Sequence, residues 1–176
     1  MLLGAFSSFK RHFPKYDVVL KTPTRVLARK IAWGGLQNQK ALALKKLLTA
    51  ITKEFGRPTL APLKKFSDAE CESFLTNLPG IGKKVARCVM LFSLGRRVFP
   101  VDTHCWRICT RLGWIRPTRK RNAFYHKDMD RLQEKIPPEL RLSLHVNMVS
   151  HGRRICKARS PKCQECVISS FCRGCR

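Results

Sequence analysis

The chain of 176 residues carries 36 lysines and arginines against 11 aspartates and glutamates, which gives a formal charge of +25. Hydrophobic residues make up 44% and charged residues 27% of the chain, which excludes a disordered or collagen-like protein and suits one domain or two small lobes. The sequence shows no apolar stretch long enough for a transmembrane helix and no signal peptide in its first residues. The charge favours a polyanionic partner, with nucleic acid ahead of an anionic membrane surface.

Apolar side chains recur at helical spacing along most of the chain, without strand-like alternation, so we expect an all-α fold. A first apolar face ends before Pro14, and Thr22 is expected to cap a helix that has Pro23 at its first position. Ser67 and Glu70 have the spacing of a capping box. Further helices are expected over about 41–55, 67–78, 82–93, 103–112, 122–135 and 138–151.

Five of the nine cysteines fall in the last 21 residues, and without a secretory signal this predicts a metal site in a reducing compartment. Cys156, Cys163, Cys166 and Cys172 have the spacing C-x6-C-x2-C-x5-C, which can close around a tetrahedral zinc ion or an iron–sulfur cluster. One short Cys-x2-Cys favours the cluster, because structural zinc sites usually pair two such knuckles. Cys175 could substitute for one of these ligands, but it breaks the spacing and is left out of the ligand set. The other cysteines, Cys71, Cys88, Cys105 and Cys109, are expected to be small buried side chains.

The segment from Leu78 to Lys84, LPGIGKK, joins two expected helices by a Gly-x-Gly turn. Gly80 and Gly82 allow the backbone to approach a ligand closely, and the start of the next helix offers N–H groups to a phosphate. Many helical hairpins need glycine only to turn, but the adjacent lysines and the high charge favour phosphate binding here.

Asp102 follows at an expected helix start, where aspartate most often serves as an N-cap. Lys84 is one of 36 basic residues, so composition alone assigns neither residue a catalytic role.

The order of LPGIGKK, then Val101-Asp102-Thr103-His104, then His151-Gly152 before the four cysteines, resembles endonuclease III and its relatives. These are helix–hairpin–helix DNA glycosylases with a Gly/Pro-rich stretch and an essential aspartate. The resemblance runs from about residue 2 to residue 172. By comparison with the family, the chain is expected to begin late, after a helix and a half that includes a glutamine-containing segment.

The resemblance implies an all-α, two-lobed helix–hairpin–helix DNA glycosylase fold with DNA in the cleft. Residues 1–97 would form a helical barrel lobe, with the hairpin at about 70–93, and residues 98–176 an iron–sulfur lobe with its cluster loop at 156–172. The cofactor implied is a [4Fe–4S] cluster held by Cys156, Cys163, Cys166 and Cys172. Lys84 matches the family's nucleophilic lysine and Asp102 its catalytic aspartate. DNA contacts are expected from Gly80, Ile81, Gly82, Lys83, Lys157, Arg159 and Lys162.

The activity implied is base-excision repair by a bifunctional DNA N-glycosylase and abasic-site lyase acting on oxidised pyrimidines. Two alternatives remain open: a monofunctional glycosylase for uracil or mismatched thymine, and a truncated, non-catalytic DNA-binding remnant. The expected partner is double-stranded DNA with a damaged base or abasic site. The protein is expected to be a monomer in the cytoplasm, associated with the nucleoid.

Overall fold

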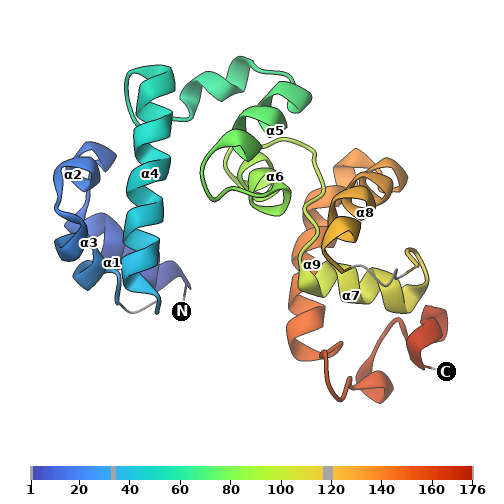
Figure 1. Cartoon of the computed structure of the whole chain (residues 1–176). Coiled ribbons are helices and arrows are strands. Elements are labelled where there is room, and N and C mark those ends of the chain that lie inside the picture. Colours follow the sequence, from blue (N-terminus) through green and yellow to red (C-terminus); the bar gives the residue numbers. More distant parts are fainter. Residues whose placement is uncertain (1, 33–34, 117–120, 176) are drawn as a thin grey trace. The chain divides into compact units, whose positions relative to one another are not determined.

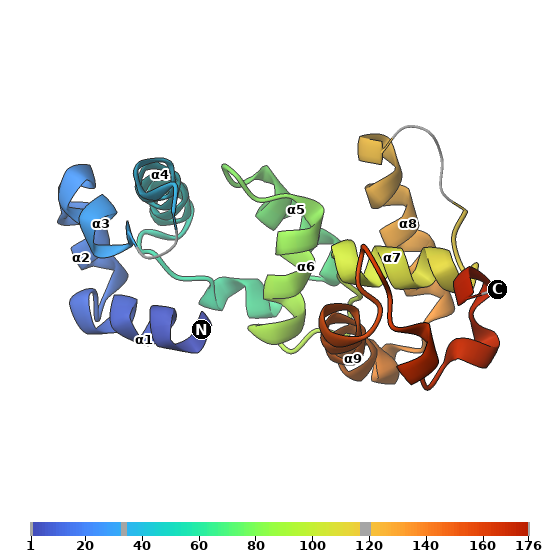
Figure 2. The same cartoon turned by 90° about the horizontal axis from the view of Figure 1, so that it is seen from below.

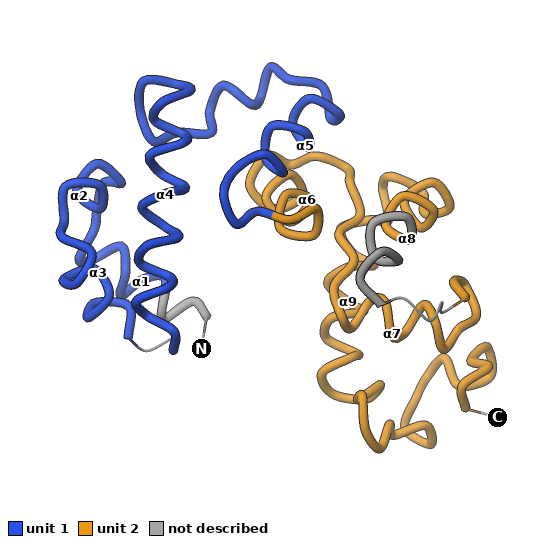
Figure 3. The backbone as a smooth tube through the Cα atoms, in the orientation of Figure 1, with its two compact units in different colours: residues 1–81 blue, residues 82–176 orange. Residues whose placement is uncertain are grey.

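The computed structural model describes residues 2–32, 35–116 and 121–175, and every regular element within these ranges is helical (Figure 1). The chain divides into two compact units, residues 1–81 and 82–176 (Figure 3). This division falls inside the Gly-x-Gly turn, whereas the lobe boundary after residue 97 stays a prediction. No helix in the described ranges has both the length and the apolar character that crossing a membrane requires.

The first unit contains α1 (Leu2–His12), α2 (Tyr16–Lys21), α3 (Thr24–Lys30), α4 (Gln37–Phe55) and α5 (Asp68–Asn77). The helix α4 packs against α2 and α3 (Figure 2). Their shared core is apolar and consists of Phe13, Val19, Leu27, Ala28, Ile31, Ala41 and Leu48. The periodic apolar positions of the sequence therefore form one buried face, as amphipathic helices require.

Two helix starts in this unit test the capping predictions. The capping box of α5 is confirmed, because Ser67 Oγ accepts from the Glu70 N–H and the Glu70 carboxylate accepts from the Ser67 N–H. The predicted N-cap at Thr22 is wrong. The Thr22 hydroxyl donates to the Val18 carbonyl at 2.7 Å, so Thr22 caps the C-terminal end of α2. The N-cap position of α3 is occupied by Pro23.

The second unit contains α6 (Lys83–Phe92), α7 (Thr103–Leu112), α8 (Arg121–Lys135) and α9 (Arg141–Arg154). The helices α7 and α9 pack together, and the apolar face of α7 lies in the core (Figures 1 and 2). The helix predicted from residue 138 begins at Arg141, because Pro138–Leu140 form a 3₁₀ turn, and it continues to Arg154. That extension carries α9 to the start of the cysteine-rich tail.

The four cysteines outside the tail differ in burial. Cys71, Cys105 and Cys109 are fully buried, as predicted. Burial raises the pKa of Cys105, and it raises that of Cys109 to about 12, so both thiols stay protonated. Cys88 is only half-buried and faces charged neighbours.

Candidate functional site

The turn before α6 leaves open space in front of a helix start. Gly80 has φ +78°, a left-handed conformation that favours glycine, and the Ile81 N–H donates to the Leu78 carbonyl at 3.2 Å. Gly82 precedes α6, and no side chain caps the helix. A Cβ atom added at Gly80 or Gly82 would meet no heavy atom within 4 Å. A phosphate can therefore approach the positive end of α6 without displacing a side chain.

Lys83, which the sequence predicts to contact DNA, forms an ion pair with a residue of α8. Its Nζ donates to Asp130 Oδ2 at 2.7 Å, and the buried Arg87 guanidinium donates to the other oxygen of the same carboxylate. Burial alone would raise the pKa of Asp130, but the bonds from Lys83 and Arg87 lower it below its usual value. The ionised carboxylate thus holds the start of α6 against α8 and shares the charge of Lys83.

Asp102 caps α7 and remains charged. Its Oδ1 accepts from the His104 N–H at 2.9 Å and from the Cys105 N–H at 2.8 Å. Burial would raise the pKa of Asp102, but the hydrogen bonds from Cys105 and the nearby imidazoles of His104 and His145 lower it below its usual value. The group is therefore a carboxylate at neutral pH.

Lys84 is exposed on α6 and lies one turn before Cys88. Burial raises the pKa of the Cys88 thiol; Lys84 opposes this shift and Asp102 adds to it. Burial lowers the pKa of His145, and there Lys84 adds to the shift while Asp102 opposes it. Because both charges act on the same thiol and the same imidazole, the structure brings Lys84 and Asp102 into one neighbourhood.

Sequence reasoning missed His145 and gave Cys88 no role at this site. His145 Nδ1 lies 2.9 Å from the Pro100 carbonyl, so this nitrogen carries the proton, and 3.5 Å from Cys105 Sγ. His145 thereby connects α9 to the residues just before Asp102. The only signal for His145 in the sequence is its position among the apolar residues of α9. That signal does not indicate a functional role, because a buried histidine at such a position is common in protein cores.

The cysteine-rich tail is attached to α7 by two arginines. Arg107 donates to the carbonyls of Gly152 and Cys156, both at 2.9 Å. A Cβ atom at Gly152 would lie 2.7 Å from His104, so glycine lets α9 approach α7 closely. Arg111 donates to Cys156 Sγ at 3.1 Å and to the Lys157 carbonyl at 2.8 Å. These contacts fix where the loop leaves α9.

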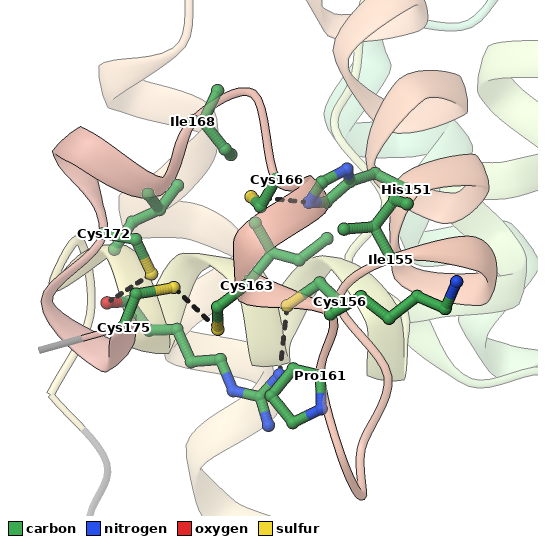
Figure 4. A pocket seen from close by; sticks show the side chains of 13 residues that line it. His151, Ile155, Cys156, Pro161, Cys163, Cys166, Ile168, Cys172 and Cys175 are labelled. Carbon is green, nitrogen blue, oxygen red and sulfur yellow. Dashed lines mark hydrogen bonds between the residues drawn. The ribbon is translucent and has the colours of Figure 1, made fainter.

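The four predicted ligands line one pocket in this tail (Figure 4). The set is Cys156, Cys163, Cys166 and Cys172, and the remaining tail cysteine, Cys175, lines the same pocket. Among the described residues, no three histidine, cysteine or acidic side chains gather closely enough to hold a single metal ion. Four cysteine thiolates are the donor set of a [4Fe–4S] cluster, so the residues of this pocket fit such a cluster.

The three cations predicted for the loop differ in their surroundings. Lys157 and Arg159 are exposed. Lys162 Nζ pairs with both oxygens of Glu165, at 2.7 and 3.0 Å, on the surface. An exposed pair of this kind is weak, so Lys162 can exchange its partner for a phosphate at little cost.

Comparisons with known proteins agree with this geometry. Residues 2–136 match the HhH-GPD superfamily of base excision DNA repair proteins, and residues 156–172 match the iron–sulfur binding domain of endonuclease III. The chain therefore belongs to the HhH-GPD superfamily. It carries the endonuclease III iron–sulfur domain, whose cofactor is a [4Fe–4S] cluster.

Among individual relatives, the chain is 38% identical over 149 residues to an Arabidopsis thaliana protein named "Putative DNA glycosylase", covering 85% of this chain and 50% of the relative. It is 34% identical over 143 residues to endonuclease III of Sulfolobus acidocaldarius, covering 79% and 58%. The chain thus spans between half and three-fifths of these relatives. A solved non-covalent endonuclease III–DNA complex matches with a TM-score of 0.81 and 25% identity, over 97% of this chain and 74% of that one. The fold is therefore the all-α fold of endonuclease III.

Proposed function

We propose that the protein is a bifunctional DNA N-glycosylase and abasic-site lyase of base-excision repair, with Lys84 as nucleophile and Asp102 as its catalytic carboxylate. The observation that supports this most is the shared neighbourhood of Lys84 and Asp102, whose charges act on the same Cys88 and His145 side chains. A DNA-binding module would need neither a lysine nor a carboxylate at this place, whereas the combined glycosylase and lyase reaction uses both.

The chemistry begins when the damaged nucleotide leaves the base stack, since the glycosidic bond is not accessible inside the duplex. The neutral Lys84 amine attacks the sugar C1′, and the base departs with the electron pair of the glycosidic bond. A proton of the attached amine then passes to the ring oxygen as the bond from C1′ to that oxygen breaks, which leaves a protonated Schiff base. Removal of a C2′ proton then expels the 3′ phosphate, which cuts the strand by β-elimination.

Asp102 would act through its charge. Positive charge builds on the sugar as the base departs, and a nearby carboxylate stabilises it, as in other glycosidases. The lowered pKa of Asp102 keeps it ionised over the neutral range, so it is ready for this role without prior deprotonation. A carboxylate can also receive the proton of the attacking amine.

DNA would be held chiefly through its phosphates. Gly80 and Gly82 keep the turn open to a phosphate, with Ile81 held between them by its bond to the Leu78 carbonyl, and Lys157 and Arg159 are exposed cations in the tail loop. Lys83 and Lys162 already have carboxylate partners, so we propose that they add positive potential to the interface. The charge of +25 would give a strong, salt-sensitive attraction to DNA.

Cys156, Cys163, Cys166 and Cys172 would hold the [4Fe–4S] cluster. When bound, the cluster supplies a cross-link that folds the tail, and the lyase chemistry requires no electron transfer from it. The proposed lobes are residues 1–97 for the helical barrel and 98–176 for the cluster lobe and Asp102. A monomer acting on genomic DNA would work in the cytoplasm at the nucleoid.

The test is a single-turnover reaction on duplexes that each carry one oxidised pyrimidine, one uracil or one mismatched thymine. We expect base release and strand cleavage to coincide on the oxidised pyrimidine, and Lys84→Ala to abolish both. Lys83→Arg is the matched control on the same helix turn, because it removes the amine but keeps the charge and can still pair with Asp130, and it should retain both steps. Base release without cleavage, on uracil or thymine, would replace this proposal by a monofunctional glycosylase. Neither step on any duplex that the protein binds would leave a non-catalytic remnant.

A further inference from the structure

The cluster pocket contains one more thiol than a four-cysteine cluster uses. Cys175 lies beyond the segment that matches the endonuclease III domain, residues 156–172, yet it lines the same pocket. Its Sγ atom lies 2.9 Å from Cys163 Sγ (Figure 4). The two sulfurs are therefore in direct contact.

Close packing of the C-terminal turn against α7 places Cys175. The turn spans Arg173–Cys175, and the Cys175 N–H donates to the Cys172 carbonyl at 3.3 Å. A Cβ atom at Gly174 would lie 3.0 Å from Arg111 Cγ, and one at Gly113 would lie 2.8 Å from Arg173 Cδ. Two glycines thus let the turn approach the helix that also contacts Cys156. The packing of Arg173 and Gly174 against α7 therefore sets the position of the fifth thiol.

Cys163 is the tail thiol in closest contact with Cys175, and Cys172 is a further neighbour of Cys175. Cys156 Sγ accepts from Arg111 at 3.1 Å, Cys166 Sγ lies 3.5 Å from His151 Nε2, and Cys172 Sγ donates to the Arg111 carbonyl at 3.6 Å. Each thiolate of a four-cysteine cluster binds a different iron atom, so ligands must stand apart. Two sulfurs in contact, Cys163 and Cys175, would therefore be alternatives for a single ligand position of a bound cluster.

We propose that Cys175 is an alternative cluster ligand that takes the place of Cys163 at this ligand position. In the exchange, the Cys175 thiol gives its proton to water and forms a bond to iron, while the bond from iron to Cys163 breaks and the released thiolate takes up a proton. No atom changes oxidation state, so the exchange needs no oxidant or reductant. The inference rests on the ligand set proposed above.

The test compares two variants that differ only at residue 175, Cys163→Ser and Cys163→Ser/Cys175→Ser. Both contain the same serine at 163, so any ligation by serine is common to both. We expect Cys163→Ser to keep the brown colour, the absorbance near 400 nm and about four irons per chain, and the double variant to lose most of its iron. Cys175→Ser alone should keep its cluster through Cys163.

Cys166→Ser is the matched control, because the partner of Cys166 is an imidazole and Cys175 contacts a different sulfur; it should lose its cluster. The corresponding alanine pair, Cys163→Ala with and without Cys175→Ala, repeats the comparison without a hydroxyl. Equal iron content within both pairs, whether high or low, would overturn the proposal. Because iron and absorbance are measured without DNA, failure here is distinguishable from failure of the glycosylase assignment.

Discussion

Asp102 has two separable roles, as N-cap of α7 and as a negative charge near Lys84, and two substitutions distinguish them. Asparagine keeps an oxygen that can accept from the His104 and Cys105 N–H groups, now 2.9 and 2.8 Å from Oδ1, but it loses the charge. Alanine loses both. The loss of an N-cap costs about 1–2 kcal/mol, and the loss of charge at a helix start costs about 0.3–1 kcal/mol.

Asp102→Ala should therefore lower the melting temperature by about 3–12 °C, at roughly 2–4 °C per kcal/mol for a chain of this size, and Asp102→Asn by less than half as much. Both should slow single-turnover base release by about 10²–10⁴-fold, the usual range for a positioned catalytic group. Helix ellipticity on heating and product yield on damaged duplex measure the two effects. An Asp102→Asn variant that releases base within about threefold of wild type would refute the electrostatic role.

Three further predictions concern other features. DNA affinity should fall about 10³-fold between about 50 and 200 mM salt if some six phosphates are contacted, and a flat titration would contradict a phosphate-led interface. Gly80→Ala, at φ +78°, should cost about 1–2 kcal/mol in urea unfolding. Gly82→Ala, at φ −90°, should preserve stability within about 0.5 kcal/mol but weaken DNA binding, because the new methyl group enters the open space before α6. Burial raises the pKa of Asp128, so the stabilisation from its protonated form is present below the unfolded pKa of about 3.9 and lost as pH rises through the folded pKa. Asp128→Asn should then raise the melting temperature at pH 7 but not at pH 3, and an equal rise at both would contradict the burial argument.

The elements that local chemistry determines were predictable from the sequence. The capping box at Ser67 and the N-cap at Asp102 depend on residues three positions apart or fewer, and both are confirmed. Thr22 was mispredicted because its hydroxyl can close the preceding helix as readily as begin the next one, and only the packing of α2 decides.

The pairings across α6, α7, α8 and the tail were not predictable. Lys83 and Asp130 are 47 residues apart, and their contact exists only because the fold brings the start of α6 to α8. Cys175 was set aside because the spacing of the other four thiols was regular, and its contact with Cys163 depends on a turn docked on Arg111. Spacing along the chain carries no information about such docking.

Borohydride trapping on a duplex with one abasic site tests the proposed function most directly. Borohydride reduces a Schiff base to a stable amine, so the enzyme becomes covalently attached to the DNA strand, and peptide mapping identifies the attacking residue. We predict a trapped band for wild type with the modification on Lys84, no band for Lys84→Ala, and a normal band for Lys83→Arg, which removes the neighbouring amine but keeps its charge. A band of equal intensity from Lys84→Ala, or a modification mapped to another amine, would contradict the assignment of Lys84 as the nucleophile.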